Sequence, residues 1–434
     1  MPEATPLQPL RGFRDFYPQD CALRNYVFSR WREVCRLYGF TEVEGPLLEP
    51  TGLYRKKSGE EVVEQLFAFT DKGGREVSLR PELTPTLARM VAARQRDYRK
   101  PLRWFSIGQF FRYEKQQVER GRLREFYQLN CDLLGDESPA ADAELIALSI
   151  DLLRAFGLGP DAFRLRLSDR QVWIEFIASQ GILPEQTEAF LQIVDKLDRE
   201  SPQRSEERLA AFGLTLDVLK QFMVSGPTRS SRLDAVLQDL RDRGLDGFVE
   251  VDLGVVRGLA YYTGLVFELF DLRHGLRAIA GGGRYDQLVA LLSDGQADLP
   301  AVGIGMGDVV LSALIEKSSE TKAGLCAYLS DCAAIDVFVV IAAESSRSAA
   351  AGLIQALRES GLAVHYPFSP AKVAKQFQAA EQSQARVAVI AGSEFPEVRV
   401  KNLATRQEEV CQGTGDVLRT VRRILDSRDQ PLLA

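Results

Sequence analysis

The sequence predicts an α+β fold, in which an antiparallel-sheet domain with a helical insertion precedes a smaller α/β domain. Apolar strand patterns separated by turns recur before and after a region at about 171–245. That region is rich in Glu, Gln, Leu and Arg and is broken by Gly and Pro, which indicates several short inserted helices. Strand and helix patterns alternate after residue 333. Since 434 residues exceed one ordinary domain, we expect a first domain over 1–325 and a second over 333–434.

The first predicted elements are a helix, a strand and a hairpin. Apolar side chains recur at helical spacing over residues 18–38, and Gly39 ends that helix. Residues 40–50 have the pattern of a strand that stops at Pro46, because proline cannot donate to a sheet ladder. Residues 65–82 predict a hairpin around a Lys-Gly-Gly turn, where glycine supplies the positive φ that a tight turn needs.

The rest of the first domain continues as strands packed with amphipathic helices. Two strands are predicted at 102–114 and 126–135, joined by a charged loop, and a helix at 140–156 carries an apolar face. Strand patterns return after the insertion and end in a glycine-punctuated strand that runs into a helix. These later elements are predicted at 248–254, 261–271, 276–286, 286–293 and 300–317.

The second domain follows a polar stretch at 316–324 that lacks periodicity and is therefore the predicted linker. Beyond it, strand and helix patterns alternate as expected for a three-layer α/β domain of about 100 residues. Strands are predicted at 335–342, 362–367, 385–392 and 397–404, and helices at 345–360, 371–382 and 415–427.

The composition predicts a globular protein of the cytoplasm. Apolar residues make up 45% and charged residues 26% of the chain. No apolar run approaches the ~20 residues of a membrane helix, and the first residues lack the apolar core of a signal peptide. The net charge of −6 does not exclude a nucleic-acid partner, because binding phosphate requires only a local basic patch.

Cysteines and histidines provide no predicted metal site. The six cysteines lack CxxC spacing, so we expect buried thiols in a reducing compartment rather than a zinc site or a disulfide framework. The two histidines, His274 and His365, lie apart from a plausible acid or nucleophile. Histidine-based catalysis and histidine-ligated metals are therefore set aside.

Arginines within the long strand pair are the first candidates for chemistry. Arg112 lies on a strand with Glu114 two residues later on the same face. Arg122 follows in the charged loop, and Phe126 could stack on a base. Any one of these arginines could be a solvated surface charge, but an arginine inside an otherwise apolar strand cannot stay buried unpaired.

Three further segments allow a functional and a structural interpretation. Glu82 ends an apolar strand, where it could accept an ammonium group or simply begin a turn or helix. Arg257 precedes Tyr261 and Tyr262; because neighbours on a strand point to opposite faces, one tyrosine could be core and the other could line a pocket. The glycines at 281–283 indicate close approach of a ligand or backbone, or a plain turn.

Together these segments resemble the histidyl-tRNA synthetases, a family of class II aminoacyl-tRNA synthetases, over nearly the whole chain. YGFTEVEGPLLEP, which includes Pro46, resembles the first class II motif, a helix and strand at a dimer interface. FRYE followed by GRLREFYQLNCD resembles the second motif. RGLAYY and AGGGRYD resemble two signatures of the histidine enzymes, and the C-terminal domain resembles their anticodon-binding module.

The resemblance implies a histidine–tRNA ligase. Histidine would attack ATP, which enters with Mg²⁺, to give histidyl-adenylate, and the histidyl group would then pass to the 3′ end of tRNA(His). The partners implied are histidine, tRNA(His) and a second copy of the chain that meets the first through the first motif. Like the residues alone, the resemblance implies no protein-bound metal and no membrane.

The resemblance also implies a role for each matching residue. Arg112 and Arg257 would be catalytic, with Arg112 holding the α-phosphate and the histidine carboxylate and Arg257 stabilising the five-coordinate phosphorus. Arg112 would thus also bind ATP, together with Arg122 at the triphosphate and Phe126 at the adenine. The residues implied to bind histidine are Glu82, Thr84, Gln128, Asp132, Tyr262 and Tyr285.

Three positions depart from the family pattern. Ala260 stands where an acidic residue normally precedes the tyrosine pair, and Asp132 stands where glutamate is usual. Val310 stands where the third class II motif supplies an arginine that sandwiches ATP. Losing that arginine could cost ~1.5–3 kcal/mol per charged hydrogen bond. The chain has the segment RGLAYYTG and, in the third motif, a Gly-Asp pair without the arginine. In both features it is similar to a divergent branch of the family that includes organelle-type plant enzymes.

The departures leave two alternatives open. One is a catalytically silent histidyl-tRNA synthetase-like regulatory subunit of ATP phosphoribosyltransferase, which senses histidine. The other is a binding protein that uses the fold without catalysis. Such regulators tend to lose phosphate-binding arginines and the anticodon domain. Because this chain keeps Arg112, Arg122, Arg257 and a full C-terminal domain, the sequence favours the enzyme.

Overall fold

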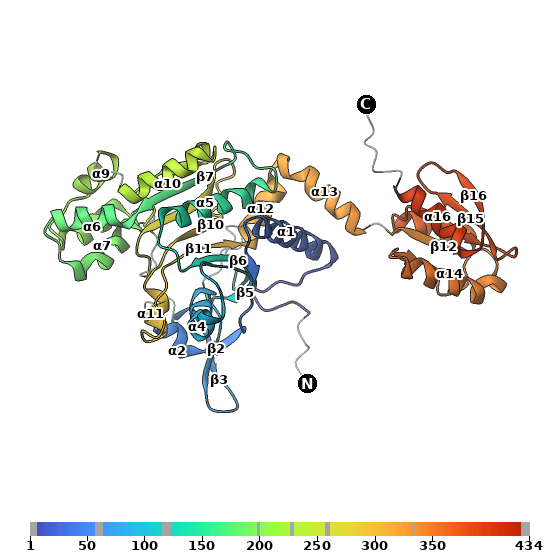
Figure 1. Ribbon diagram of the computed structural model, residues 1–434, viewed down its shortest axis with the longest axis horizontal. Helices are drawn as coiled ribbons and strands as arrows, with labels where there is room; N and C mark the ends of the chain where they lie inside the picture. The colour runs from blue at the N-terminus through green and yellow to red at the C-terminus, as the bar shows by residue number, and fades with distance from the viewer. Residues whose placement is uncertain are drawn as a thin grey trace. The chain divides into compact units, whose positions relative to one another are not determined.

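The computed structural model describes two compact units, residues 1–325 and 326–434 (Figure 1). Each unit has its own hydrophobic core. Within the described part of the chain, no helix combines the length and apolarity needed to cross a bilayer. The described ranges are 7–56, 64–114, 123–197, 200–225, 230–256, 261–333 and 335–426.

An eight-stranded sheet forms the centre of the first unit, in the order β1-β5-β6-β11-β10-β9-β7-β8. Its inner strands pair antiparallel, while the edge strands β1 (Thr41–Glu42) and β8 (Val249–Val251) pair parallel to their neighbours. The antiparallel-sheet domain expected from the sequence is thereby confirmed. The inner strands are β5 (Leu102–Phe111), β6 (Glu125–Leu134), β7 (Phe163–Asp169), β9 (Leu265–Asp271), β10 (Ala280–Arg284) and β11 (Ala301–Gly307).

A three-stranded sheet, ordered β2-β4-β3, contains the predicted hairpin between β3 (Phe67–Thr70) and β4 (Glu76–Leu79). The strand predicted over 40–50 is wrong in extent, because β1 and β2 (Leu48–Pro50) belong to different sheets. Gly45 separates them at a point where an added Cβ would lie 2.4 Å from a methyl group of Thr86. Close packing and the following proline thus end the first strand early.

Helices cover both faces of the large sheet. On one face, α5 (Pro139–Arg154) packs against β6 and β11, and α1 (Pro18–Leu37) and α12 (Asp308–Lys317) lie beside it (Figure 1). The Ser138 side chain caps α5 by accepting from the amide of Ala141. On the other face, α4 (Thr84–Arg94) and α11 (Leu288–Leu292) join the core next to the site.

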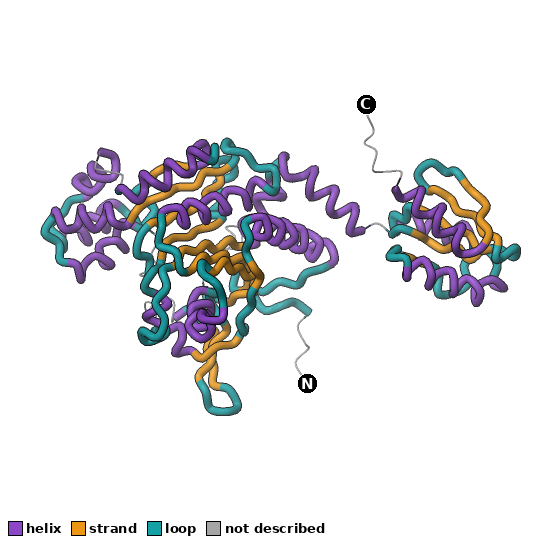
Figure 2. The backbone as a smooth tube through the Cα atoms, in the orientation of Figure 1, coloured by secondary structure: helices purple, strands orange, loops and turns teal. Residues whose placement is uncertain are grey.

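The predicted helical insertion between β7 and β8 is present as five helices of the described chain (Figure 2). The first four pack around the fully buried Trp173, and the fifth packs on α5. Serine and aspartate side chains at Asp169, Ser201 and Ser230 cap three of them. The helices are α6 (Arg170–Ser179), α7 (Thr187–Val194), α8 (Pro202–Ala210), α9 (Leu216–Ser225) and α10 (Ser231–Asp242).

The stretch predicted as a linker, 316–324, is largely helical, because α13 (Ser319–Ala333) occupies most of it, and the two units divide within that helix between Leu325 and Cys326. The Thr321 hydroxyl is buried and donates to the carbonyl oxygen of Ser318 at 2.8 Å. Glu320 forms an ion pair with Arg273 of the sheet domain. The local hydrogen bond and the tertiary ion pair together stabilise a helix whose weak periodicity gave no signal in the sequence.

The second unit is the predicted three-layer α/β domain, with a five-stranded sheet in the order β13-β12-β14-β15-β16. Helices α14 (Arg347–Glu359) and α16 (Gly413–Asp426) cover one face, and α15 (Val373–Gln382) covers the other. Strand β16 (Glu408–Gln412) was not predicted, because Cys411 is its one buried side chain. The remaining strands are β12 (Val337–Ile341), β13 (Val364–His365), β14 (Val387–Ala391) and β15 (Glu397–Asn402).

Candidate functional site

The candidate site lies on one face of the central strands, and β6 supplies its floor. Alternate residues of a strand share a face, and Phe126, Gln128, Asn130 and Asp132 of β6 all line the site. The neighbouring strand β11 is glycine-rich at 303, 305 and 307, so this floor stays open.

A polar pocket brings together all the residues to which the sequence assigned histidine binding. They come from the start of α4, from β6 and from the two segments that flank β9 and β10. The structure places all of them around one cavity, and their role in binding histidine remains a prediction. The pocket is lined by Glu82, Thr84, Arg112, Gln128, Asn130, Asp132, Tyr261, Tyr262, Gly281, Tyr285, Gly303, Ile304 and Gly305.

Glycines make the room that these side chains need. An added Cβ at Gly303 would lie 2.1 Å from the Asp132 carboxylate, and one at Gly305 would lie 2.6 Å from the Gln128 amide nitrogen. An added Cβ at Gly283 would lie 2.8 Å from the ring of Tyr262. The glycine run belongs to strand β10 rather than to a turn, and it allows close packing around the pocket.

The tyrosine pair does not behave as alternation on a strand predicts. Tyr261 and Tyr262 precede β9, and both line the pocket, with ring centroids 4.7 Å apart. The expectation that one faces the core and the other the pocket is therefore wrong, because opposite-facing neighbours require extended strand backbone. Tyr285 meets Tyr261 edge to face at 6.0 Å.

Tyr285 and Asp132 form the buried end of the pocket. The Tyr285 hydroxyl donates a hydrogen bond to an Asp132 carboxylate oxygen. Burial and the neighbouring Asp132 raise the pKa of Tyr285 well above its usual value, so the phenol keeps its proton. Gln128 donates to the Asn130 side-chain oxygen at 2.8 Å. The end of the pocket is thus an ordered polar surface suited to a small polar ligand.

Glu82 reaches the pocket from a turn held by a buried arginine. Arg80 is buried; its Nε donates to the carbonyl oxygen of Gln109 at 2.9 Å, and its Nη1 donates to that of Gly45 at 2.9 Å. Glu82 and Thr84 follow where this turn enters α4. Glu82 therefore combines both interpretations of its sequence position, because it precedes a helix and its carboxylate also faces the pocket.

A second pocket adjoins the first and shares Arg112 with it. Arg112 follows the last residue of β5, donates from Nε to the carbonyl oxygen of Pro81 at 2.9 Å, and lies 5.2 Å from the ring centroid of Phe126. Arg112, Phe126 and Val310, which the sequence placed on the ATP side, all line this second pocket. Its lining residues are Arg112, Glu114, Leu123, Phe126, Arg277, Gly307, Val309 and Val310.

Arg122, Arg257 and Ala260 lie outside the described residues. Their predicted roles rest on the sequence alone.

Asp308, which begins α12 next to Val309, ties three elements together. It accepts from the Tyr127 amide at 2.9 Å and lies 3.0 Å from Arg14 Nη1. Burial raises the pKa of Asp308, and the Arg14 charge opposes that rise. Asp308 thus anchors the N-terminal segment and β6 against α12.

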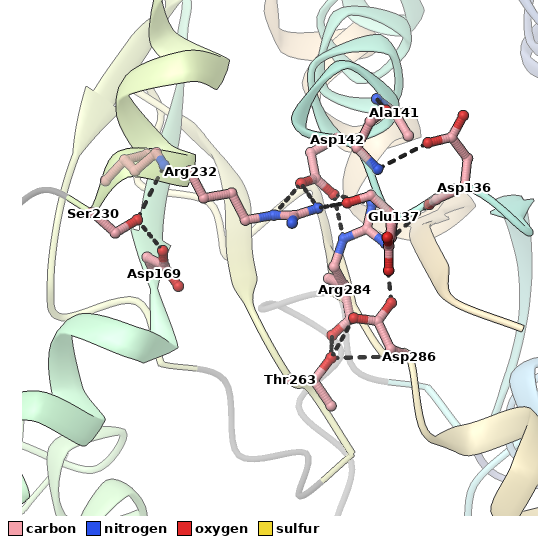
Figure 3. Close-up of polar contacts among 12 residues, drawn as sticks. Asp136, Glu137, Ala141, Asp142, Asp169, Ser230, Arg232, Thr263, Arg284 and Asp286 are labelled. Carbon is pink, nitrogen blue, oxygen red and sulfur yellow. Dashed lines mark hydrogen bonds and ion pairs between the residues drawn. The ribbon is translucent and has the colours of Figure 1, made fainter.

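An ion network supports the segments that carry Tyr262 and Tyr285 (Figure 3). Arg284 and Asp142 are each 1% exposed, and Arg284 Nε donates to Asp142 at 2.7 Å. Arg284 Nη1 also donates to Asp286 at 3.0 Å, and the Asp286 amide donates to the Thr263 hydroxyl oxygen at 3.1 Å. The network therefore ties the start of β9 to the end of β10, next to the pocket.

The insertion joins the same network through Arg232 of α10. Its Nε donates to Asp142 at 2.7 Å, and its Nη2 donates to the carbonyl oxygen of Glu137 at 2.7 Å (Figure 3). Asp142 therefore bridges an arginine of the helical insertion and an arginine of the central sheet.

Several lining residues were missed in the sequence, among them Asn130, Tyr261 and Arg277. Asn130 could have been found, because it lies midway between Gln128 and Asp132 in a period of two. For Tyr261, the sequence left open whether it or Tyr262 lines a pocket. Arg277 precedes β10 and had no local signal, because only the neighbouring strand brings it to the second pocket.

Comparison with known proteins covers both units. Residues 12–307 match the family described as histidyl-tRNA synthetase, and residues 336–423 match the family described as anticodon binding domain. A histidine–tRNA ligase of Opitutus terrae is 43% identical over 425 residues, which are 92% of this chain and 95% of that relative. One of Natronomonas pharaonis is 38% identical over 417 residues, which are 91% and 94% of the two chains.

A solved structure shares the fold. The crystal structure of histidyl-tRNA synthetase from Nostoc sp. PCC 7120 superposes with a TM-score of 0.73 at 24% identity, covering 97% of this chain and 100% of that one. At this identity the match concerns the fold alone, and it confirms the predicted combination of an antiparallel-sheet domain with a C-terminal α/β domain.

Proposed function

The chain belongs to the histidyl-tRNA synthetase family, and from this premise we propose how its pocket residues act. The activity is that of a histidine–tRNA ligase: histidine is activated with ATP and transferred to tRNA. The single observation that supports the assignment of residues is the sharing of Arg112 between the polar pocket and the second pocket. A cation at that junction can contact the histidine carboxylate and the α-phosphate together.

In this proposal the polar pocket holds histidine. Glu82 and Thr84 accept the ammonium group near the pocket entrance, since a carboxylate and a hydroxyl oxygen both accept hydrogen bonds. Gln128 and Asp132 form hydrogen bonds with the imidazole nitrogens, and Tyr285 orients Asp132 by its own hydrogen bond. The rings of Tyr261 and Tyr262 close over the imidazole.

The second pocket holds ATP, and the form of ATP that serves as substrate is its complex with Mg²⁺. Phe126 offers its ring face to the adenine, and Arg112 lies beside it at the α-phosphate end. Arg122 and Arg257 keep their sequence-based roles, at the triphosphate and at the five-coordinate phosphorus.

The first chemical step forms one bond and breaks one. A histidine carboxylate oxygen attacks the α-phosphorus, the bond to the bridging oxygen breaks, and pyrophosphate leaves with that electron pair. Arg112 holds both reacting groups and balances the charge on the phosphoryl oxygens. In the second step a 3′-terminal hydroxyl of tRNA attacks the histidyl carbonyl carbon, loses its proton and displaces AMP.

The C-terminal unit binds tRNA in this proposal. A pocket there is lined by Tyr366, Phe368, Arg358 and Lys375 among others. Phe368 is 85% exposed and meets Tyr366 edge to face at 5.1 Å, and Arg358 lies 5.6 Å from the Tyr366 ring centroid. Exposed aromatic rings beside cations suit unstacked bases and phosphates.

Histidine-dependent exchange of pyrophosphate into ATP tests the activity. We expect exchange with histidine and none with other amino acids, and formation of histidyl-tRNA when tRNA(His) is added. A purified, folded chain that shows no exchange with Mg²⁺ and tRNA present would contradict the ligase assignment. Arg112→Ala should lower the exchange rate at least ~100-fold, because it removes contacts to both substrates.

A further inference from the structure

The start of β10 brings an unassigned arginine to the nucleotide pocket. Arg277 lies in the segment that leads from β9 to β10, and it lines the second pocket together with Arg112, Phe126 and Val310. Val310 occupies the position at which the third class II motif supplies an arginine. The pocket therefore has an arginine in its lining that comes from the segment before β10 rather than from α12.

The order of strands explains why Arg277 reaches this place. Strand β10 pairs with β11, and at the start of that pairing Ala280 lies opposite Met306, next to the end of β11. Arg277 precedes β10 by three residues, and α12, which carries Val310, follows β11 directly, so the two segments leave the sheet at the same end. Both residues line the second pocket, and an arginine at 277 can thus reach the space that a residue-310 arginine would otherwise enter.

The two arginines that line the second pocket stand at different walls. Arg112 follows β5 and lies beside Phe126, whereas Arg277 precedes β10, which is separated from β6 by β11 in the sheet. Neighbouring Arg273 points elsewhere, because it pairs with Asp161 and Glu320. ATP carries several negative charges and a flat base, and a guanidinium group binds either one.

We infer that Arg277 binds ATP in place of the third-motif arginine. Its guanidinium contacts the nucleotide from the wall formed by Gly307–Val310, across the pocket from Phe126 and Arg112. The apolar Val310 leaves the space for that side chain. This inference rests on the proposed function for the identity of the nucleotide, and on pocket lining and the order of strands for the residue.

The test uses the full chain and compares Arg277→Ala with Arg273→Ala. Both variants remove one arginine from the same segment, but Arg273 lies outside the pocket. Arg277→Ala should raise the KM for ATP in pyrophosphate exchange ~10-fold or more, as the loss of a charged hydrogen bond predicts, and should leave the KM for histidine within about twofold. Arg273→Ala should leave both KM values unchanged.

A compensating arginine makes the test specific. Val310→Arg alone should be neutral or harmful, because Arg277 already fills the space. In the Arg277→Ala background the same Val310→Arg change should recover a large part of the lost ATP affinity. An unchanged KM for ATP in Arg277→Ala, equal losses for ATP and histidine, or a large gain from Val310→Arg in the otherwise unaltered chain would each overturn the inference.

Direct binding separates this inference from the proposed function. ATP titration followed by calorimetry needs no turnover, and Arg277→Gln serves as a second variant if thermal melting shows that Arg277→Ala is poorly folded. A wild-type chain without exchange activity contradicts the proposed function. Equal ATP affinity of wild type and both Arg277 variants contradicts the role of Arg277 alone.

Discussion

At the scale of single residues, the absence of a side chain is as important as its presence. Gly303 and Gly305 lie where any Cβ would meet the Asp132 or Gln128 side chain. The strand that carries them forms the pocket floor only because those two positions are empty of side chains. If histidine binds in this pocket as proposed, its specificity depends on glycines that need not contact it.

Gly303→Ala should close the amino-acid pocket. Its Cβ would lie 2.1 Å from an Asp132 oxygen and 3.0 Å from the Tyr285 ring, so the Asp132–Tyr285 pair has to move. We expect the KM for histidine to rise ~10-fold or more, as for a lost charged hydrogen bond, with a much smaller change for ATP. Exchange kinetics measure both values.

Gly352→Ala is the matched control, because an added Cβ there meets nothing within 4 Å. It should keep both KM values. If Gly303→Ala binds histidine as tightly as the unaltered chain, Asp132 does not contact the substrate.

At the scale of elements, the site depends on how neighbouring segments are tied together. Asp142 of α5 holds Arg284 of β10 and Arg232 of the insertion, and Arg284 reaches Asp286 and through it Thr263 (Figure 3). Burial raises the pKa of Asp142, and the two guanidinium charges oppose that rise. The carboxylate is thus stable in the core only with its arginine partners.

Asp142→Ala should strongly destabilise the first unit. It leaves the buried Arg284 without its main carboxylate, and breaking a buried pair costs about 3–5 kcal/mol. Arg232→Ala removes the partly exposed partner and should cost only about 1 kcal/mol or less. Chemical denaturation measures the free energy of unfolding of each variant. Equal losses for both variants would show that Asp142 serves Arg232 rather than Arg284.

The segment that leads to Arg277 has a pH-sensitive anchor in Asp271. Burial raises the pKa of Asp271, but hydrogen bonds from the His274 ring and from the amides of His274, Arg273 and Leu276 lower it below its ordinary value of 3.8. Because the folded pKa is depressed, this contribution to stability is present above about pH 3.8 and is lost as the pH falls through the folded pKa.

Asp271→Asn should therefore lower the free energy of unfolding by about 1–2 kcal/mol near neutral pH, as expected for weakened charged hydrogen bonds. The difference from the unaltered chain should shrink as the pH falls below about 3.8. Denaturant titrations at several pH values measure it, and a deficit that stays constant with pH would contradict the ionised role of Asp271.

At the scale of the whole molecule, activation and tRNA recognition belong to separate compact units. The two pockets proposed to hold histidine and ATP are lined only by residues of the first unit. The second unit has a sheet and core of its own and presents the aromatic pair Tyr366 and Phe368. Changes in that pair should leave adenylate formation intact.

Phe368→Ala should lower kcat/KM for tRNA histidylation about 5- to 150-fold, because stacking on one base contributes ~1–3 kcal/mol. Pyrophosphate exchange without tRNA should be unchanged. Val410→Ala, an exposed apolar residue on β16 of the same unit, is the matched control and should preserve both activities. Equal loss of exchange and histidylation in Phe368→Ala would contradict the separation of roles.

The sequence by itself determined the fold class, the long strands and the set of motif residues. Periodicity is a local property, so β5, β6 and α5 were predicted from spacing alone, and the polar residues of β6 follow from a period of two. The family resemblance rests on short motifs whose residues are close to one another in the sequence.

Only the tertiary structure decided which of these residues meet. Arg277 and Val310 line one pocket because β10 pairs with β11, and both Tyr261 and Tyr262 enter the other pocket because β9 starts after them. The polar stretch at 316–324 is largely helical, and Glu320 in it pairs with Arg273 of the sheet domain. In each case the deciding energy comes from contacts between segments distant in the chain, which no local pattern records.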